Sequence, residues 1–300
     1  MSENVKESVR ILLSEIIDYA GLFPPSKLLM PEAVINYAAY KNSNYNWMLG
    51  RFVVPVGRLD ELLESAEEFV SRDVDGGWRL SVLAGEDIYE TFRKIEDFNA
   101  KNSPKAVCDA IEIKVDSPSL IETVAEILPP NIKAYFEISP EGDLAEMIST
   151  LAINRQRAKI RTGGVTPEAF PPSKSIIRFV RTCMAANVPF KATAGLHHPV
   201  RCLKPLTYEA DAPEGVMNGF LNLFLATGFA RGGFKPNLLE ELLEDESAEN
   251  FRFDESGVHW REDFFLSNSQ LKVVRERNII SFGSCSFEEP IEDLRHLGLL

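Results

Sequence analysis

Short apolar segments alternate with longer amphipathic ones along the chain. Apolar residues at every second position are typical of strands, and apolar residues at every third or fourth position are typical of helices. The pattern predicts eight strands, over residues 17–23, 51–56, 78–84, 106–115, 132–139, 157–162, 189–194 and 279–283. It predicts helices over residues 3–16, 31–42, 59–71, 86–99, 117–127, 141–151, 173–187 and 213–229.

Eight strands, each followed by a helix, predict an α/β fold of the (β/α)8 TIM-barrel type. The helix over residues 3–16 precedes the first strand. An open doubly wound sheet is the alternative, but no GxGxxG sequence follows the first strand. We therefore expect residues 1–300 to form one barrel domain with an N-terminal helix.

Residues 231–278, between the seventh helix and the eighth strand, do not fit the plain repeat. They are predicted to hold an acidic helix over 237–244, a hairpin over 251–260 with a Ser256-Gly257 turn, and a helix over 269–277. We expect this insertion to be a surface excursion or a contact between copies of the chain, which leaves a homo-oligomer open. A lid over the barrel mouth is the alternative.

Strands four to seven carry charged residues on one face and apolar residues on the other. Since alternate residues of a barrel strand point inward, the apolar set marks the face that packs on helices. The polar set should then point into the barrel, and comprises Glu112, Lys114, Glu137, Lys159, Arg161, Lys191, Thr193 and Gly195, with His197 just beyond. These side chains are expected at the carboxyl ends of the strands, where barrel enzymes have their active sites.

The predicted cavity is positive within an acidic protein. Its ionised side chains are four cations and two carboxylates, whereas the chain has a formal net charge of -13. A surface of that charge repels nucleic acid and anionic membranes, so the expected ligand is a small anionic metabolite. The alternative is a set of interior ion pairs, with Lys114 bonded to Glu137 and Lys159 bonded to Glu112.

Other features of composition point to a cytoplasmic protein. No apolar segment reaches the roughly 18 residues that span a bilayer, and the first residues form no apolar signal region. The four cysteines are far apart and form no CxxC pair, which predicts neither disulfides nor a cysteine zinc site. Cys285 is expected to be a buried small side chain, with a nucleophile as the alternative.

Lys159 and Lys191 are predicted to be neighbours on adjacent strands. Mutual repulsion and burial should each lower the pKa of both ammonium groups. A lysine with a lowered pKa attacks carbonyl carbons and forms Schiff bases, with Glu112 or Glu137 to move protons. Lys159 is the expected nucleophile, and Lys191 is expected to tune it.

At these lysines the chain has a local resemblance to class I aldolases of the deoxyribose-phosphate type. Those enzymes carry one lysine on strand six, in a Lys-x-x-Thr-Gly context, and another on strand seven before a glycine turn. The matching residues are Lys159 with Thr162-Gly163, and Lys191 with Gly195. The resemblance covers about a dozen residues and implies Schiff-base chemistry and a lyase activity.

The chain departs from the aldolase pattern on two strands. Arg161 stands where a small residue is expected, and the Glu112-x-Lys114 spacing does not match the strand-four pattern. The whole chain also resembles an uncharacterised family of bacterial barrel proteins with Lys-x-Arg-x-Gly-Gly and Lys-Ala-Thr-Ala-Gly-Leu-His-His signatures. That resemblance implies the fold and supplies no activity.

Two adjacent histidines end the seventh strand. His197 is expected to assist as a general acid or base, and a hydrogen-bonded loop histidine is the alternative. His198 points the other way in an extended chain, so the pair is not expected to bind one metal. A metal site would need Glu112, Glu137 and His197 together.

The remaining candidates are groups that bind anions. The Arg161 and Arg201 guanidinium groups match a carboxylate or phosphate, although Arg201 fits a surface ion pair equally well. Backbone amides after strands six and eight could cradle an anion. This binding set is Arg161, Lys114, Thr193, Gly163, Gly164, Gly195, His198, Arg201 and Ser284.

The sequence thus predicts an aldolase-like lyase that acts on a small phosphorylated or carboxylated carbonyl metabolite and needs no cofactor. Two alternatives stay open. The first is a metal-assisted lyase or hydrolase that uses Glu112, Glu137 and His197 as ligands. The second is a barrel that binds an anion without catalysis.

Overall fold

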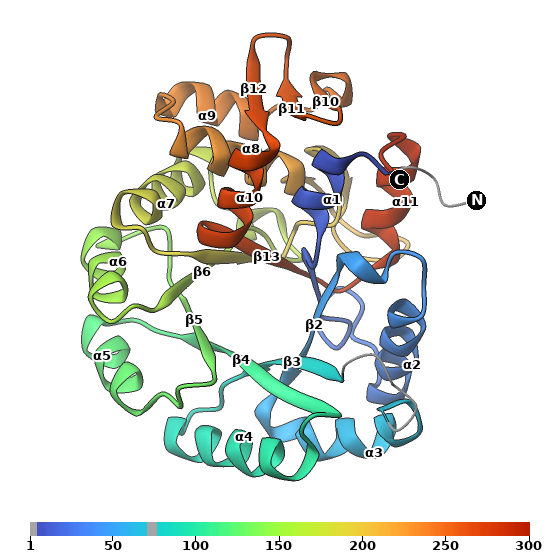
Figure 1. Cartoon of the computed structure of the whole chain (residues 1–300), viewed down its shortest axis with the longest axis vertical. Coiled ribbons are helices and arrows are strands. Elements are labelled where there is room, and N and C mark those ends of the chain that lie inside the picture. The colour runs from blue at the N-terminus through green and yellow to red at the C-terminus, as the bar shows by residue number, and fades with distance from the viewer. Residues whose placement is uncertain (1–4, 71–76) are drawn as a thin grey trace.

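The computed structural model describes residues 5–70 and 77–300. Eight parallel strands form a closed barrel, in which each strand is hydrogen-bonded to the next and the last returns to the first (Figure 1). The strands are β1 (Ile17–Tyr19), β2 (Leu49–Pro55), β3 (Trp78–Leu83), β4 (Ala106–Lys114), β5 (Lys133–Glu137), β6 (Arg157–Arg161), β7 (Phe190–Thr193) and β13 (Ile279–Ser284). The predicted (β/α)8 barrel and all eight of its strands are confirmed.

Helices surround this barrel. They are α2 (Met30–Lys41), α3 (Leu59–Val70), α4 (Ile88–Asn102), α5 (Pro118–Ile127), α6 (Leu144–Ile153), α7 (Ser173–Ala186), α8 (Phe220–Arg231) and α11 (Glu288–His296), with α1 (Glu7–Leu13) ahead of β1. Side chains cap some of them, since Asp87 accepts a hydrogen bond from the Glu90 amide and Asp143 from the Glu146 amide. No helix in the described part of the chain is both long and apolar enough to cross a bilayer.

Two predicted boundaries are wrong. The first strand ends at Tyr19 rather than at residue 23, because the chain turns after Ala20 and the Phe23 amide donates to the Ala20 carbonyl at 2.9 Å. The helix expected over 213–229 begins at Phe220. The residues before it form β9 (Glu214–Met217), which pairs with β8 (Cys202–Pro205) as a hairpin after β7.

The insertion at 231–278 contains the predicted elements and one additional strand. They are α9 (Pro236–Leu243), β10 (Phe251–Phe253), β11 (Gly257–Trp260), β12 (Phe264–Ser267) and α10 (Asn268–Arg277). The three strands form an antiparallel sheet that packs beside α1, where Lys6 Nζ donates to the Phe253 carbonyl at 2.9 Å. In Figure 1 this sheet lies outside the barrel.

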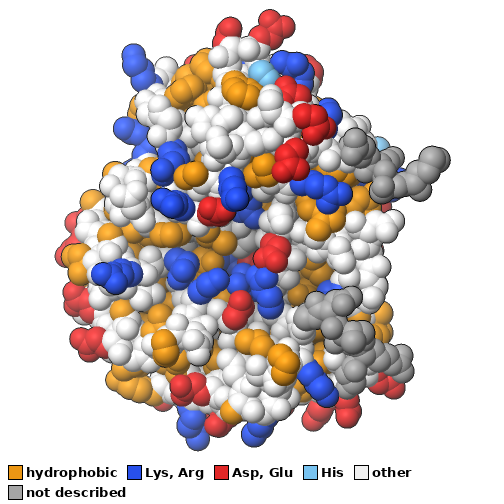
Figure 2. All heavy atoms as spheres, viewed as in Figure 1, with side chains coloured by type: hydrophobic (Ala, Val, Ile, Leu, Met, Phe, Trp, Pro, Cys, Tyr) orange, Lys and Arg blue, Asp and Glu red, His pale blue; other side chains and the backbone are white. Residues whose placement is uncertain are grey.

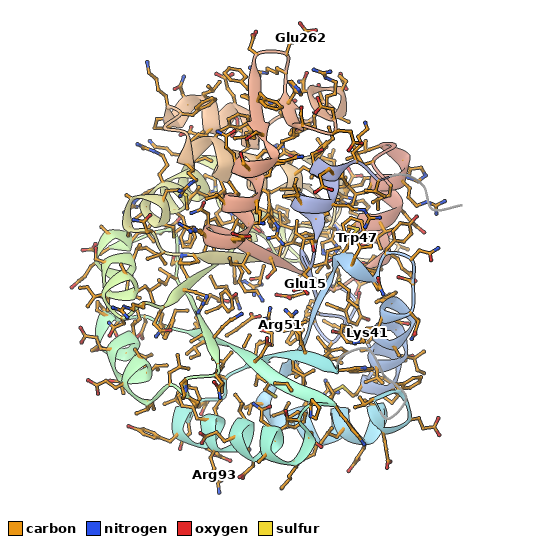
Figure 3. The ribbon with its side chains drawn as sticks, in the orientation of Figure 1. Glu15, Lys41, Trp47, Arg51, Arg93 and Glu262 are labelled. Carbon is orange, nitrogen blue, oxygen red and sulfur yellow. The ribbon has the colours of Figure 1, made fainter. Side chains whose placement is uncertain are left out.

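The amino-terminal end of the barrel faces the viewer in Figures 1 to 3, because the strands follow one another clockwise there and their crossovers are right-handed. Lys and Arg side chains gather near the middle of this face (Figure 2), and Arg51 lies there (Figure 3). The buried Arg51 guanidinium donates to both Asp109 oxygens, at 2.6 and 2.7 Å. This bidentate pair helps to close the barrel at the end opposite the cavity described next.

Candidate active site

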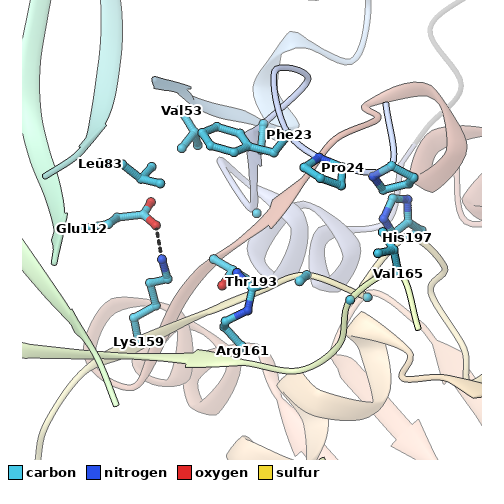
Figure 4. Close-up of a pocket in the computed structure, with 16 residues that line it drawn as sticks. Phe23, Pro24, Val53, Leu83, Glu112, Lys159, Arg161, Val165, Thr193 and His197 are labelled. Atoms are coloured by element: carbon cyan, nitrogen blue, oxygen red, sulfur yellow. Dashed lines mark hydrogen bonds and ion pairs between the residues drawn. The ribbon is translucent and has the colours of Figure 1, made fainter. Parts of the chain in front are cut away.

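A cavity of about 210 Å³ opens at the carboxyl-terminal end of the barrel. Its lining includes Leu83, Arg161 and Thr193, which are the last residues of β3, β6 and β7. Phe23 and Val53 lie on one side of it, and Lys159 lies across from them (Figure 4). The cavity therefore occupies the position in which barrel enzymes bind their substrates.

Five charged side chains of alternating sign form a chain through the barrel interior, and two of them, Glu112 and Lys159, also line this cavity. Lys191 Nζ lies 2.6 Å from Asp18 Oδ2 and 2.7 Å from Glu112 Oε1. Lys159 Nζ lies 2.7 Å from Glu112 Oε2 and 2.8 Å from Glu137 Oε2. The order is thus Asp18, Lys191, Glu112, Lys159, Glu137, and Glu112 bridges the two lysines.

Strand register explains this chain of charges. Glu137, Lys159 and Lys191 are direct partners across β5, β6 and β7, so their side chains emerge at one level of the barrel. The predicted inward direction of Glu112, Lys159 and Lys191 is confirmed by their burial. Of the two predicted interior ion pairs, Lys159 with Glu112 forms.

Hydroxyl and amide donors complete the coordination of the two buried carboxylates. Ser281 Oγ and the Arg51 amide each donate to Asp18 at 2.8 Å. Ser81 Oγ donates to Glu112 Oε1 at 2.8 Å. Each carboxylate therefore has several donors, which is the condition under which a buried charge is tolerated.

The predicted lowering of the Lys191 pKa is wrong. Burial lowers the pKa of Lys191, but the carboxylates of Asp18 and Glu112 outweigh burial and hold that pKa above its ordinary value. Burial raises the pKa of Glu112, but Lys159 and Lys191 outweigh it and hold that pKa well below its ordinary value. Lys191 is thus a fixed cation, and Glu112 is a fixed anion.

The charges that line the cavity are mostly positive. They belong to Lys159, Arg161, His197 and Glu112. Burial lowers the pKa of His197, but contacts with Cys285 and Glu289 raise it to about 10, so the imidazole is a cation at neutral pH.

Arg161 and Lys114 differ in their relation to this cavity. Arg161 lines it, and within the described residues its guanidinium has no ion pair and no hydrogen bond. Lys114, the last residue of β4, is exposed and is not part of the lining, so its predicted place in the cavity is wrong. It lies at the strand end, beyond the walls, and its predicted pair with Glu137 does not form because Glu137 contacts Lys159 instead.

The two adjacent histidines bind different carboxylates. His197 Nδ1 lies 2.8 Å from Glu289 Oε2, and His198 Nδ1 lies 2.6 Å from Asp293 Oδ2. Both acids belong to α11. His197 lines the cavity, whereas His198 is absent from the lining and is held against the outer helix.

The glycine signature after β6 and β7 has a packing role. A Cβ on Gly195 would lie 2.7 Å from Phe170 Cε1 and 2.9 Å from the Gly163 Cα. Gly195 also has a φ of 71°, which only glycine adopts without strain. The close approach of these two strand ends therefore accounts for glycine at positions 163 and 195. Gly164 and Gly195 also line the cavity.

The remaining predicted binding residues are placed as follows. Thr193 lines the cavity, and its Oγ1 lies 3.5 Å from the Ile160 carbonyl. Ser284 is buried outside the lining and accepts a hydrogen bond from the Ser286 amide. Arg201 pairs with Glu246 at 3.4 Å, which is the surface ion pair that the sequence left open.

No set of three or more His, Cys, Asp or Glu side chains within residues 5–70 and 77–300 is arranged to hold a metal ion. The metal-assisted alternative needed Glu112, Glu137 and His197 to converge. Instead, Glu112 and Glu137 both bind Lys159, and His197 binds Glu289. The described residues therefore do not fit the metal-assisted alternative.

Sequence reasoning missed several residues of the site. Asp18 is not among the predicted site residues, and it lies at the end of the charge chain. Glu289 belongs to α11, and Tyr208 belongs to the loop between β8 and β9. The alternation of residues along strands does not predict side-chain directions in helices or loops. Phe23 was placed in the first strand without a role in the site, but it lines the cavity together with Pro24.

No protein-family model matches the chain, and no curated protein is similar enough to match. Among solved structures, the chain is similar to the catalytic domain of a hyperthermophilic chitinase from Pyrococcus furiosus. That similarity has a TM-score of 0.37 at 10% sequence identity, and covers 62% of this chain and 75% of the other. At this level it carries no argument about activity, so function rests on the cavity itself.

Proposed function

We propose that the protein is an aldolase-like lyase that binds a small anionic carbonyl metabolite and forms a Schiff base on Lys159. The fold supports an enzyme in general terms, because barrels of this type carry active sites at this end. The observation that carries the proposal is the position of Lys159. Its ammonium group lies on the cavity wall within 2.8 Å of two carboxylates.

Lys159 must lose a proton before it can attack a carbonyl carbon. Glu137 is the proposed acceptor, because its side chain is 18% exposed and Lys159 is its ion-pair partner. Glu112 is less suited to hold a proton, since Lys191 keeps it ionised. Lys191 thus has an electrostatic role in the proposal, and Lys159 has the nucleophilic one.

The proposed reaction follows from the chemistry of a lysine amine. The Lys159 nitrogen attacks the carbonyl carbon, and the carbonyl oxygen leaves as water to give an iminium ion. The bond between the α- and β-carbons then breaks, and its electrons form an enamine with the iminium carbon. The β-hydroxyl proton passes to a carboxylate, and the β-carbon leaves as an aldehyde. Protonation of the enamine carbon and hydrolysis release the second product and restore the amine.

Arg161 is the proposed group that binds the acid end of the substrate. It follows Lys159 by two positions on β6, so both side chains leave the strand on the same face. The residue spacing places their origins about 6.6 Å apart. A guanidinium with no ion-pair partner in the described residues is suited to bind a carboxylate or phosphate bidentately.

Cleavage of anionic β-hydroxy carbonyl compounds tests the proposal. The wild type would be incubated with phosphorylated sugars and with hydroxylated keto acids, and the released aldehyde would be measured. We expect turnover of one class, loss of turnover in Lys159→Met, and a raised KM in Arg161→Gln. Lys272→Met removes an exposed lysine on α10 and serves as the matched control.

Other outcomes point away from the lyase. Binding of an anion without turnover in the wild type would favour the barrel that binds without catalysis. Turnover that survives in Lys159→Met would exclude Lys159 as the nucleophile.

A further inference from the structure

A second group of reactive side chains lies beside the cavity. Cys285 Sγ lies 4.0 Å from His197 Nε2, and His197 Nδ1 lies 2.8 Å from Glu289 Oε2. Tyr208 Oη contacts both ends of this group, at 3.8 Å from Cys285 Sγ and 3.0 Å from Glu289 Oε2. A thiol, an imidazole and a carboxylate in this order form the arrangement that activates a nucleophile.

Separate elements bring these side chains together. Cys285 directly follows β13, His197 follows the turn after β7, and Glu289 lies in the first turn of α11. The Glu289 amide donates to Ser286 Oγ at 3.1 Å, which fixes the start of that helix next to the thiol. Ser26 Oγ also donates to the Cys285 carbonyl at 3.3 Å. The proposed Lys159 chemistry uses none of these contacts.

Cys285 differs electrostatically from the other cysteines. Burial raises its pKa, but the hydrogen bond and charge of His197 outweigh burial and lower that pKa below the ordinary value. The pKa values of Cys108, Cys183 and Cys202 are all raised, and that of Cys202 reaches about 11. Cys285 is therefore the cysteine whose thiolate form is favoured by its surroundings, chiefly by the contact with His197.

The other titratable groups that face Cys285 are neutral at physiological pH. Burial raises the pKa of Tyr19 to about 12, and it also raises the pKa values of Tyr40 and Tyr208 above their ordinary range. His197 and Glu289 are thus the ionised side chains that act directly on the thiol. They form one cation and one anion, and the cation is next to the sulfur.

We propose that Cys285, His197 and Glu289 form a reactive thiolate site that is oxidised by a small hydroperoxide. The sulfur attacks the terminal peroxide oxygen, and the oxygen–oxygen bond breaks. The sulfur loses two electrons and becomes a sulfenic acid, which keeps the hydroxyl group. The leaving oxygen takes the proton of the His197 imidazolium at Nε2 and departs as water or an alcohol.

Burial selects the size of the oxidant. Cys285 is 5% exposed and is not part of the cavity lining, whereas His197 is. Such low exposure excludes a bulky acyl or sugar substrate, and we expect a molecule the size of hydrogen peroxide to be small enough to reach the sulfur. Tyr208 Oη and His197 Nε2 are polar groups next to the sulfur and can hydrogen-bond to the peroxide.

Labelling of the sulfenic acid tests this site. The full-length protein would be treated with one equivalent of hydrogen peroxide and then denatured in the presence of dimedone, so that burial does not hinder the label. The labelled peptide would be identified by mass spectrometry. We expect label on Cys285 in the wild type and in Cys202→Ser, which removes another half-buried cysteine. We expect none at position 285 in Cys285→Ser.

The role of the imidazole has its own readout. A thiol with the ordinary pKa of about 8.5 is only about 3% ionised at pH 7, so the rate at which hydrogen peroxide oxidises Cys285, read as dimedone label after denaturation, should fall by up to about tenfold in His197→Gln, after allowing for the higher nucleophilicity of a more basic thiolate. In the wild type the pH midpoint of that rate should lie below the ordinary thiol pKa of about 8.5.

Two results would overturn the proposal. One is labelling of Cys285 no faster than labelling of Cys202. The other is a wild-type oxidation rate that rises with pH with the midpoint of an ordinary thiol, near about 8.5. Both use the wild type, so poor folding of a variant cannot obscure them.

Discussion

Lys191 Nζ lies 2.6 Å from Asp18 Oδ2, although 173 positions separate the two residues in the sequence. They belong to β7 and β1, which are not neighbours in the barrel because β13 lies between them. The bond therefore crosses the barrel interior and links β1 to β7 directly. Both side chains are 1% exposed, so water does not compete for the bond.

Replacement of Lys191 by methionine should destabilise the protein strongly. It would leave Asp18 and Glu112 buried without their shared cation, and breaking a buried ion pair in this way costs about 3–5 kcal/mol. Lys159→Met should cost less, because Lys159 faces the cavity and Glu137 is partly exposed. Urea denaturation of both variants measures the difference, and equal losses would contradict the account.

The interior carboxylates should make the protein sensitive to acid. Asp18 and Glu112 both have pKa values below those of the unfolded chain, which are about 3.9 and 4.3. A lowered pKa adds stability that is present above the unfolded value and is lost as the pH falls toward the folded one. The free energy of unfolding should therefore fall below about pH 4, and less steeply in Lys191→Met. If the free energy of unfolding falls with pH as steeply in Lys191→Met as in the wild type, the acid sensitivity does not arise from this chain of charges.

His197 should remain protonated well above the usual pH. Its pKa is raised to about 10, compared with about 6.5 in an unfolded chain. The stability that this group contributes is fully present below about pH 6.5 and is lost as the pH rises through about 10. NMR titration of the imidazole should show this high pKa, with a lower one in Glu289→Gln. A midpoint near 6.5 in the wild type would mean that the contacts with Cys285 and Glu289 do not persist in solution.

Alanine at Gly195 should be far more damaging than alanine at Gly142. Both glycines have positive φ, so each substitution carries a left-handed backbone cost of about 1–2 kcal/mol. No atom lies within 4 Å of a Cβ at Gly142, whereas a Cβ at Gly195 meets the Gly163 backbone at 2.9 Å. Thermal unfolding of the pair isolates the cost of this contact, and similar melting temperatures would argue against the close approach of β6 and β7.

The period of two along a strand predicted much of the site. It placed Glu112, Lys159 and Lys191 in the interior, since their helix-facing neighbours are apolar and the barrel needs both sets. It failed for Lys114. Alternation predicts the direction of a side chain but not where the strand ends, and Lys114 is the exposed last residue of β4.

The electrostatic partners could not be predicted in the same way. The predicted lowering of the lysine pKa values rests on the repulsion between Lys159 and Lys191 on adjacent strands. That prediction leaves out Asp18, whose carboxylate approaches Lys191 only when the barrel closes. The contact of Cys285 with His197 depends on the loops after β13 and β7. Loop conformation has no simple period, so no partner could be predicted for Cys285, and the choice between a small buried side chain and a nucleophile stayed open.

The most direct test of the central claim is reductive trapping on Lys159. The wild type would be incubated with each anionic carbonyl compound and reduced with borohydride, and peptides would then be mapped by mass spectrometry. A Schiff base predicts an adduct on Lys159 whose mass is that of the carbonyl compound minus one oxygen atom, with no adduct at that site in Lys159→Met. Turnover of a carbonyl substrate without any trapped adduct on Lys159 would contradict the account.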